Sequence, residues 1–470
     1  RQYLNNGPKD LIGNSGKGKE YAYRSYFGRV MYSYADRYLF QANIRHDGSS
    51  RFAKKHRWGT FPSFSAGWVL SEENFMKNLN WEWLSFLKIR ATWGALGNER
   101  IGDFPYMSTI AFGNTIFYQN NGIYFDQTAS QQKYAIENVT WEKTESTDIG
   151  LDISFLNNRL RVNGDYYWKN TKDMLLAMAI PDFLGFSDPD VNAGKMSTKG
   201  YELNVSWNDH IGDFSYGIAI NFSDFTSKMG DLQGTQFLGD KVKMEGSEFN
   251  EWYGYVSDGL FLTEEDLKNS PKINDKNTQL GDIKYKDISG PDGVPDGKIS
   301  PEYDRVLLGS SLPHFLYGGN INLGYKNFDL SLAFQGVGKQ NARLAREMVE
   351  PFRNNYGNFP AIIDGNYWSP YNTDEQNAVA KYPRLTHVNK SSNYAMSDYW
   401  LFNGGYFRLK NITLGYTFPK EWMNAIGIKG ARIYASASDL FCLSKYPKGW
   451  DPEMGVSEYP ITTSILLGVS

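Results

Sequence analysis

The chain has 470 residues, which exceeds the usual size of one hydrophobic core and fits either two or three soluble domains or one large barrel. A formal net charge of −3 argues against nucleic acid as a partner. The mean hydropathy is −0.51, and no stretch approaches the roughly 18 apolar residues of a membrane-spanning helix. This does not exclude a membrane protein, because in a β-barrel only alternate residues face lipid and the mean hydropathy stays low.

Two composition features bear on the class of protein. Aromatic residues make up 16 % of the chain, which suits the aromatic girdles of a membrane barrel and the surface of a soluble glycan-binding β-protein equally well. Cys442 is the one cysteine, so no disulfide can form within the chain. The chain starts in a polar, Gly-rich stretch without an initiator Met, and we therefore expect a fragment of a longer protein.

Segments in which apolar and polar residues alternate recur along the chain. Residues at period two lie on opposite faces of a sheet, so each segment predicts a strand with one apolar and one polar face. The clearest segments, in chain order, are residues 38–45, 148–155, 160–168, 214–222, 315–325 and 328–335. Together with the turn signals between them, the pattern predicts about thirteen strands. A soluble sandwich would show the same alternation but would cover its apolar face with a second sheet.

Long and short connections alternate between these predicted strands. Short turns fall at residues 35–37, 157–158 and 326–327, whereas residues 227–312 and 338–403 form very long loops. Loops this long are uncommon in a compact soluble domain, but they are expected on the external side of a transmembrane barrel. The sequence therefore predicts an all-β chain whose strands form part of a transmembrane antiparallel barrel.

The odd number of predicted strands bears on completeness. Bacterial single-chain barrels have an even number of antiparallel strands, and an open sheet in lipid would leave unpaired backbone groups at two edges. We therefore expect the rest of the barrel to come from residues outside this chain.

Several segments resemble the SusC/RagA-type TonB-dependent outer-membrane transporters. Two of them are Trp93-Gly94-Ala95-Leu96-Gly97-Asn98 and Asn411-Ile412-Thr413-Leu414-Gly415-Tyr416-Thr417-Phe418-Pro419. The others are residues 26–30, 36–40, 45–52, 58–68, 253–255, 258–261, 431–434 and 439–441. Each piece is short, but together they cover nearly the whole chain in order.

The resemblance implies that residues 1–470 are the C-terminal portion of a barrel of about 22 strands, the size of plugged transporters. It also implies that the N-terminal barrel strands, a plug and a motif that engages the TonB complex belong to the rest of the protein. A SusD-like surface lipoprotein is the implied partner, and it would act as a lid. The expected location is the outer membrane of a Gram-negative bacterium. No catalytic activity and no required cofactor are expected.

An acidic loop is the best candidate for a metal site. Ca²⁺ and Mg²⁺ prefer oxygen ligands from closely spaced carboxylates, and a Gly allows the sharp turn of such a loop. Asp287, Asp292, Asp296 and Asp304 provide the carboxylates within residues 287–304. The spacing departs from an EF-hand, because Val294 stands where a third oxygen ligand would be. Metal binding and a solvated turn cluster remain equal alternatives.

Catalysis finds little support, because no two of the five His stand at metal-ligand spacing and no nucleophile elbow or P-loop appears. Ligand contacts are expected in the long loops, where flat aromatic rings could stack on sugars or pack peptide side chains. Loop packing or contact with the lid is the alternative for each residue. The candidate substrate-binding residues are Trp252, Tyr253, Arg353, Asn354, Trp368, Tyr371, Tyr399 and Trp400.

The sequence thus predicts an importer that takes up an oligosaccharide and releases it into the periplasm. The same machinery importing an oligopeptide is the first alternative. A soluble carbohydrate-binding or carbohydrate-active β-protein is the second, and solubility without detergent would favour it.

Overall fold

The protein is described by a computed structural model that covers residues 18–119, 122–131, 134–178, 182–234, 238–274, 276–353, 359–455 and 458–470. Thirteen strands of these residues form one antiparallel sheet, in agreement with the predicted number. Its strands, in sheet order, are β1 (Tyr23–Tyr34), β2 (Tyr38–Ser49), β3 (Trp58–Val69), β4 (Leu84–Asn98), β7 (Glu142–Phe155), β8 (Leu160–Lys172), β11 (Met196–Ile211), β12 (Phe214–Met229), β18 (His314–Tyr325), β19 (Phe328–Lys339), β22 (Tyr406–Thr417), β23 (Arg432–Ser444) and β24 (Ser464–Val469).

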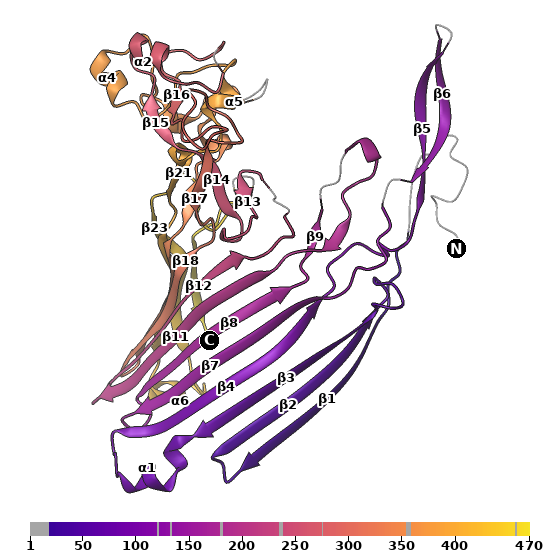
Figure 1. Ribbon diagram of the computed structural model, residues 1–470. Helices are drawn as coiled ribbons and strands as arrows, with labels where there is room; N and C mark the ends of the chain where they lie inside the picture. The colour runs from indigo at the N-terminus through magenta and orange to yellow at the C-terminus, as the bar shows by residue number, and fades with distance from the viewer. Residues whose placement is uncertain are drawn as a thin grey trace.

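The sheet is a curved wall whose strands run diagonally, with β1 near one border and the C-terminal strands at the other (Figure 1). Each strand pairs with its neighbours in the sheet order, and within this sheet β1 pairs only with β2 and β24 only with β23. No helix of the described residues has the length and apolar character needed to cross a membrane, a finding that says nothing of a β-barrel.

Cross-strand register places the alternating residues on two distinct faces. Ile321 of β18 pairs with Ile218 on one side and Leu332 on the other. The preceding residue, Asn320, points to the opposite face beside Ala219 and Ala333. Because side chains alternate along a strand, this register gives the wall one apolar face and one face of polar and small residues.

Short connections lie at one end of the wall, as predicted. Positive φ values at the turn residues Asp36, Asn158 and Lys326 provide the left-handed backbone that tight hairpins need. The two moderate connections lie on the same side and contain short helices: η2 (Leu70–Glu72), α1 (Asn74–Asn78) and α6 (Lys420–Ala425). These helices let longer connections stay close to the strand ends.

Glu73 ties one of these connections to the wall. Its carboxylate accepts hydrogen bonds from the Tyr38 hydroxyl at 2.5 Å, the Trp68 indole at 3.0 Å and the Arg37 guanidinium at 3.1 Å. These donors, the Tyr38 hydroxyl first, hold the pKa of the Glu73 carboxyl below its usual value of 4.5. A lowered pKa means that the ionised form stabilises the fold at neutral pH and that this stabilisation is lost as the pH falls through the lowered pKa.

Glu73→Gln should therefore lower the melting temperature of the complete transporter at neutral pH. The difference from the unmodified protein should shrink as the pH falls below 4.5 and through the lowered pKa of the Glu73 carboxyl, where the carboxyl becomes protonated. Differential scanning calorimetry over a pH series measures this. A melting difference that is the same at every pH would show that the charge of Glu73 has no role.

Long connections rise from the other end of the wall, and two of them join into one folded body. Residues 230–313 and 340–405, here called the external unit, contain short strands and helices packed around a common core. Its elements are β13 (Lys241–Val242), β14 (Glu251–Tyr255), β15 (Ser257–Leu260), α2 (Glu264–Asn269), β16 (Ile283–Tyr285), β17 (Arg305–Gly309), β20 (Asn341–Arg343), α3 (Arg346–Val349), η4 (Ala361–Ile363), α4 (Asp374–Ala378), α5 (Lys390–Asn393), η5 (Asp398–Trp400) and β21 (Leu401–Asn403).

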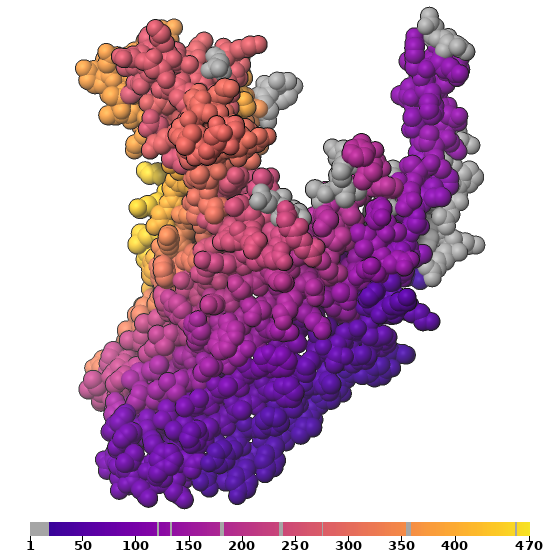
Figure 2. Space-filling view, viewed as in Figure 1, coloured from indigo at the N-terminus to yellow at the C-terminus, as the bar shows by residue number. Residues whose placement is uncertain are grey.

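Two further long connections lie over the N-terminal half of the wall. The β4–β7 connection contains a long hairpin of β5 (Ile110–Gln119) and β6 (Gly122–Gln131). The β8–β11 connection contains β9 (Leu175–Ala177), η3 (Asp182–Leu184) and β10 (Asp190–Asn192). In the space-filling view the hairpin and the external unit stand apart above the wall, with a broad hollow between them (Figure 2).

Candidate functional site

The external unit is held together by a core that draws on both of its loops. Tyr255 and Tyr285 come from the first loop, and Tyr394 and Trp400 from the second. The rings of Tyr394 and Trp400 stack at a centroid distance of 5.1 Å. Burial of this many aromatic side chains stabilises the unit and gives it a shape of its own above the wall.

A buried polar network links the same two loops around Asp282. The Asp282 carboxylate is fully buried, forms an ion pair with Arg384, and accepts hydrogen bonds from Arg384 at 3.1 Å, Asn389 at 2.8 Å and Asn393 at 2.9 Å. The backbone N–H of Gln279 also donates to it at 2.9 Å. A buried charge is tolerated only when it is paired and hydrogen-bonded, so this network fixes residues 384–393 against residues 279–282.

The structure contradicts the prediction that Trp400 binds ligand. Only 2 % of its surface is exposed, its ring packs against Tyr382, Tyr394 and Tyr399, and its indole N–H donates to the Asn393 carbonyl at 2.9 Å. A ligand cannot stack on a ring whose faces are already covered. Trp400 is a core residue of the external unit.

Three other predicted aromatic residues of this loop lie in different surroundings. Trp368 packs against the core, and its ring lies where a side chain on Gly281 would be. The Tyr399 hydroxyl donates to the Lys381 carbonyl at 2.8 Å, and burial raises the pKa of the Tyr399 hydroxyl. Tyr371, by contrast, is 96 % exposed, so its ring is open to a ligand or a partner.

The remaining predicted residues lie on strands or in short segments of the external unit. The Trp252 indole donates to the Asn341 carbonyl and its ring lies 4.6 Å from the Lys241 ammonium, whose pKa burial lowers. Tyr253 has the Arg305 guanidinium 4.8 Å above its ring. Both rings therefore already carry a cation on one face.

Two predicted polar residues remain. Arg353 forms an ion pair with Glu347 at 2.5 Å, while Asn354 lies outside the described residues. The predicted binding residues that the structure describes are thus dispersed over the external unit and do not converge on one cavity.

The acidic loop is organised around Asp304, whose carboxylate is fully buried. It accepts backbone N–H bonds from Ile288 at 2.8 Å, Ser289 at 3.3 Å and Ser300 at 2.7 Å. Two of the other acidic residues also cap backbone groups, since Gly297 donates to Asp287 and Lys298 to Asp296, whereas Asp292 is exposed. These carboxylates therefore shape the loop.

Metal binding by this loop stays a prediction. Among the residues that the structure describes, no group of three or more His, Cys, Asp or Glu is arranged to hold a metal ion. Ca²⁺ would have to share the carboxylates of Asp287, Asp296 and Asp304 with the amides that they cap. A rise in the melting temperature of the external unit on addition of calcium would support the prediction, and an unchanged melting temperature would contradict it.

Asp304→Ala should loosen residues 287–304 because it removes one acceptor for three backbone amides. We expect a local loss of about 2 kcal/mol, the typical effect of losing hydrogen bonds to a charged group. Hydrogen exchange of peptides from this loop measures it, with Asp292→Ala as the matched exposed control. Equal exchange in the two variants would show that Asp304 does not organise the loop.

The polar face of the wall carries its own charge networks. Arg90 of β4 lies 3.2 Å from Asp152, 2.7 Å from Asp165 and 3.8 Å from Asp148. Farther along the wall, buried Arg408 of β22 contacts Asp439, Asp451 and Glu453. Groups of this kind would not be stable against lipid, so this face lines the interior of a barrel.

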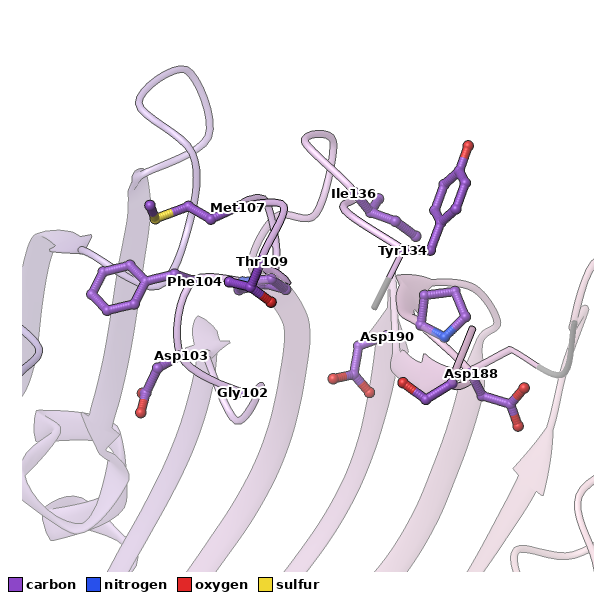
Figure 3. A pocket seen from close by; sticks show the side chains of 12 residues that line it. Gly102, Asp103, Phe104, Met107, Thr109, Tyr134, Ile136, Asp188 and Asp190 are labelled. Carbon is purple, nitrogen blue, oxygen red and sulfur yellow. The ribbon is translucent and has the colours of Figure 1, made fainter. Parts of the chain in front are cut away.

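A separate pocket of about 260 Å³ lies where the β4–β7 and β8–β11 connections meet (Figure 3). Its apolar lining includes Phe104, Met107, Tyr134 and Ile136 of the first connection. The second connection contributes Ser187, Asp188, Pro189 and Asp190. None of the binding residues predicted from the sequence lines this pocket. Asp103 lies far from Asp188 and Asp190 in the sequence, and only the folded loops bring residues 102–109 next to residues 187–190.

Together, the curved antiparallel wall, its apolar and polar faces and its alternating connections define a segment of an outer-membrane β-barrel. Residues 2–440 match the family described as TonB dependent receptor-like, beta-barrel, and the chain belongs to that family of outer-membrane receptors. This is a receptor and transporter family rather than an enzyme family.

Two curated receptors are similar to the chain in sequence. The chain is 32 % identical over 465 residues to TonB-dependent receptor SusC of Bacteroides thetaiotaomicron, covering 95 % of this chain and 43 % of SusC. It is 31 % identical over 453 residues to TonB-dependent receptor P3 of Formosa agariphila, covering 91 % of this chain and 42 % of P3. The chain therefore spans less than half the length of these curated relatives.

The fold is shared with a solved structure described as the RagAB peptide transporter. The TM-score is 0.77 at 23 % sequence identity, with 97 % of this chain and 49 % of the other chain aligned. This similarity confirms the fold.

Proposed function

We propose that the complete protein is a TonB-dependent importer that takes up an oligomeric nutrient together with a SusD-like surface lipoprotein. The observation that carries the proposal is the wall itself, with a polar inner face below long, folded external loops. Such a wall encloses an aqueous path, and the external loops provide a surface on which a ligand could be captured. Membership of the TonB-dependent receptor family supports it, as does the relation to SusC.

In this proposal, the parts of the transporter that couple uptake to energy lie outside this chain. A plug and a TonB-engaging motif belong to the remainder of the protein, and displacement of the plug would open the path. This chain would contribute the wall, the vestibule formed by its external loops, and the surface on which the lid docks. None of its described residues is assigned a catalytic role.

An oligosaccharide is the substrate class that the sequence favours, because exposed aromatic rings can stack on sugars. Tyr371 is the predicted ring that remains open for this role. An oligopeptide is the second candidate, because a solved neighbour that is described as a peptide transporter shares the fold.

Uptake by whole cells tests the proposal. Cells that express the complete protein and its lipoprotein should accumulate a labelled oligomer, and deletion of TonB should reduce the accumulation to the background of cells without the transporter. Mass spectrometry of the purified complex identifies the substrate class by the ligands that co-purify. Accumulation that is unchanged without TonB would contradict the proposal.

A further inference from the structure

The apolar face of the wall carries lysine residues at its external border. Side chains alternate without interruption along β7, β8, β11 and β12, so every second residue shares the face of Leu151, Leu203 and Phe222. Each of these strands has one lysine on that face, close to the end from which the long connections rise (Figure 1). All four lysines, here called the lysine belt, are exposed: Lys143, Lys172, Lys199 and Lys228.

Strand register groups the lysine belt into two pairs. Lys143 and Lys172 are direct cross-strand partners on β7 and β8. Lys199 lies two residues from Ser197, the partner of Lys228, so the Cα atoms of Lys199 and Lys228 are roughly 8 Å apart. Like charges that face each other on neighbouring strands are destabilising, and an anion between them removes the repulsion. Each pair is therefore arranged to hold an anion.

Two carboxylates of the same face lie near the lysine belt, and both already have partners. Glu145 forms an ion pair with Lys172 at 2.8 Å. Asp224 lies 2.8 Å from Nδ1 of His314. The other three lysines of the belt form no ion pair with any residue that the structure describes. The belt thus carries positive charge that the chain does not balance there.

Aromatic rings lie next to the lysine belt on the side of the membrane interior. Trp168 is the cross-strand partner of Lys199, and the rings of Trp168 and Tyr166 lie 6.1 Å apart. Tyr201 and Phe222 continue the row, with a ring distance of 6.0 Å. Trp and Tyr gather where the hydrocarbon of a membrane meets the headgroups. The lysine belt therefore lies at the level of the headgroups, and its long side chains can extend toward them.

A phosphate on a lipid headgroup fits this position. Phosphate accepts charge-assisted hydrogen bonds from several donors, and clustered basic side chains at a membrane surface attract anionic lipids. The apolar face continues from the aromatic rings to the rest of the wall without a break, so the acyl chains of the same lipid would lie along it. A soluble anion would use the charge alone, and this continuity favours the lipid.

We propose that the lysine belt binds the phosphate groups of a phosphorylated lipid in the external leaflet and anchors this border of the wall in the membrane. Lys143 and Lys172 hold one phosphate, and Lys199 and Lys228 hold another. The lipid is a partner in addition to those of the proposed function, and its binding does not depend on what the transporter imports.

Lipid titrations of the complete transporter in detergent test the assignment. The probes are lipid A with two phosphates and the same lipid after enzymatic removal of both phosphates, which keeps the acyl chains. Native mass spectrometry at each lipid concentration gives the bound fraction. Lipid A should bind about tenfold more tightly than the dephosphorylated form, the factor expected for a hydrogen bond to a charged group. Raising the ionic strength should reduce this preference, because salt screens exposed charges.

Variants connect the preference to the lysine belt. Lys143→Gln, Lys199→Gln and Lys228→Gln combined should make the transporter bind both lipids with similar affinity, while its melting temperature stays unchanged because these side chains are exposed. Arginine at the same three positions keeps the charge and should keep the preference. The matched control replaces three exposed lysines of the external unit with glutamine and should behave like the unmodified protein: Lys268, Lys298 and Lys381.

Three results would overturn the proposal. One is equal binding of the two lipids to the unmodified transporter, and another is an unchanged preference in the combined glutamine variant. The third is displacement of lipid A by an equal concentration of inorganic phosphate, which would identify a site for a soluble anion. TonB-dependent uptake would stand in each of these cases, so failure of the inference is distinct from failure of the proposed function.

Discussion

Replacing Asp282 with alanine should unfold the external unit while the wall stays folded. The carboxylate is fully buried and bound by Arg384, Asn389 and Asn393, so its loss leaves a buried guanidinium and two amides without their acceptor. Breaking a buried ion pair by removing one partner typically costs about 4 kcal/mol. A body built from two loops has little stability to spare, and we expect it to open.

Hydrogen exchange with mass spectrometry on the complete transporter separates the two parts. Peptides from residues 255–285 and 384–400 should lose protection in Asp282→Ala, whereas peptides from β18 and β19 should keep theirs. Asp292→Ala is the matched control, because Asp292 lies in the same loop and is exposed. Unchanged protection of the external unit in Asp282→Ala would show that the network does not hold the two loops together.

The second large effect is expected at Arg408. Its guanidinium is 3 % exposed and contacts Glu453 at 2.7 Å, Asp451, and Asp439 at 3.7 Å. Arg408→Met keeps the volume but leaves three carboxylates to Lys410 alone, which reaches Asp439 at 2.7 Å and Glu453 at 3.6 Å. We expect a loss of about 4 kcal/mol, since like charges would then face one another in a partly dry site.

Thermal unfolding of the complete transporter measures this loss. Lys410→Met is the control, because Lys410 is 31 % exposed and its removal leaves Arg408 in place. It should lower the melting temperature much less than Arg408→Met. Similar melting temperatures for the two variants would contradict a central role for Arg408 in joining β22, β23 and the connection that follows them.

The wall could be predicted from the sequence because its signals are local. Alternation within β18 and β19 and the turn at Lys326 are each contained in about a dozen residues, and period two maps directly onto the two faces of a strand. The number of strands and the alternation of long and short connections follow from the same signals. The structure confirms the number of strands and the alternation of long and short connections.

The external loops could not be predicted in the same way, because their contacts join distant residues. Trp400 was predicted to contact ligand because aromatic rings in long loops can stack on sugars or pack peptide side chains, but Tyr382, Tyr394 and Tyr399 surround it. Asp282 pairs with residues more than 100 positions away, and nothing in its local sequence indicates this. The pocket around Asp190 likewise exists only where two connections meet.

The central claim is that the apolar face of the wall meets lipid and the polar face lines an aqueous interior. Spin labels on single cysteines along β18 and β19 test it directly, in the complete transporter reconstituted in liposomes with Cys442→Ser as background. Labels at Ile321 and Leu332 should be accessible to oxygen dissolved in lipid. Labels at Asn320 and Ser331 should be accessible to a water-soluble nickel complex. Accessibility to the nickel complex at all four positions would contradict the account.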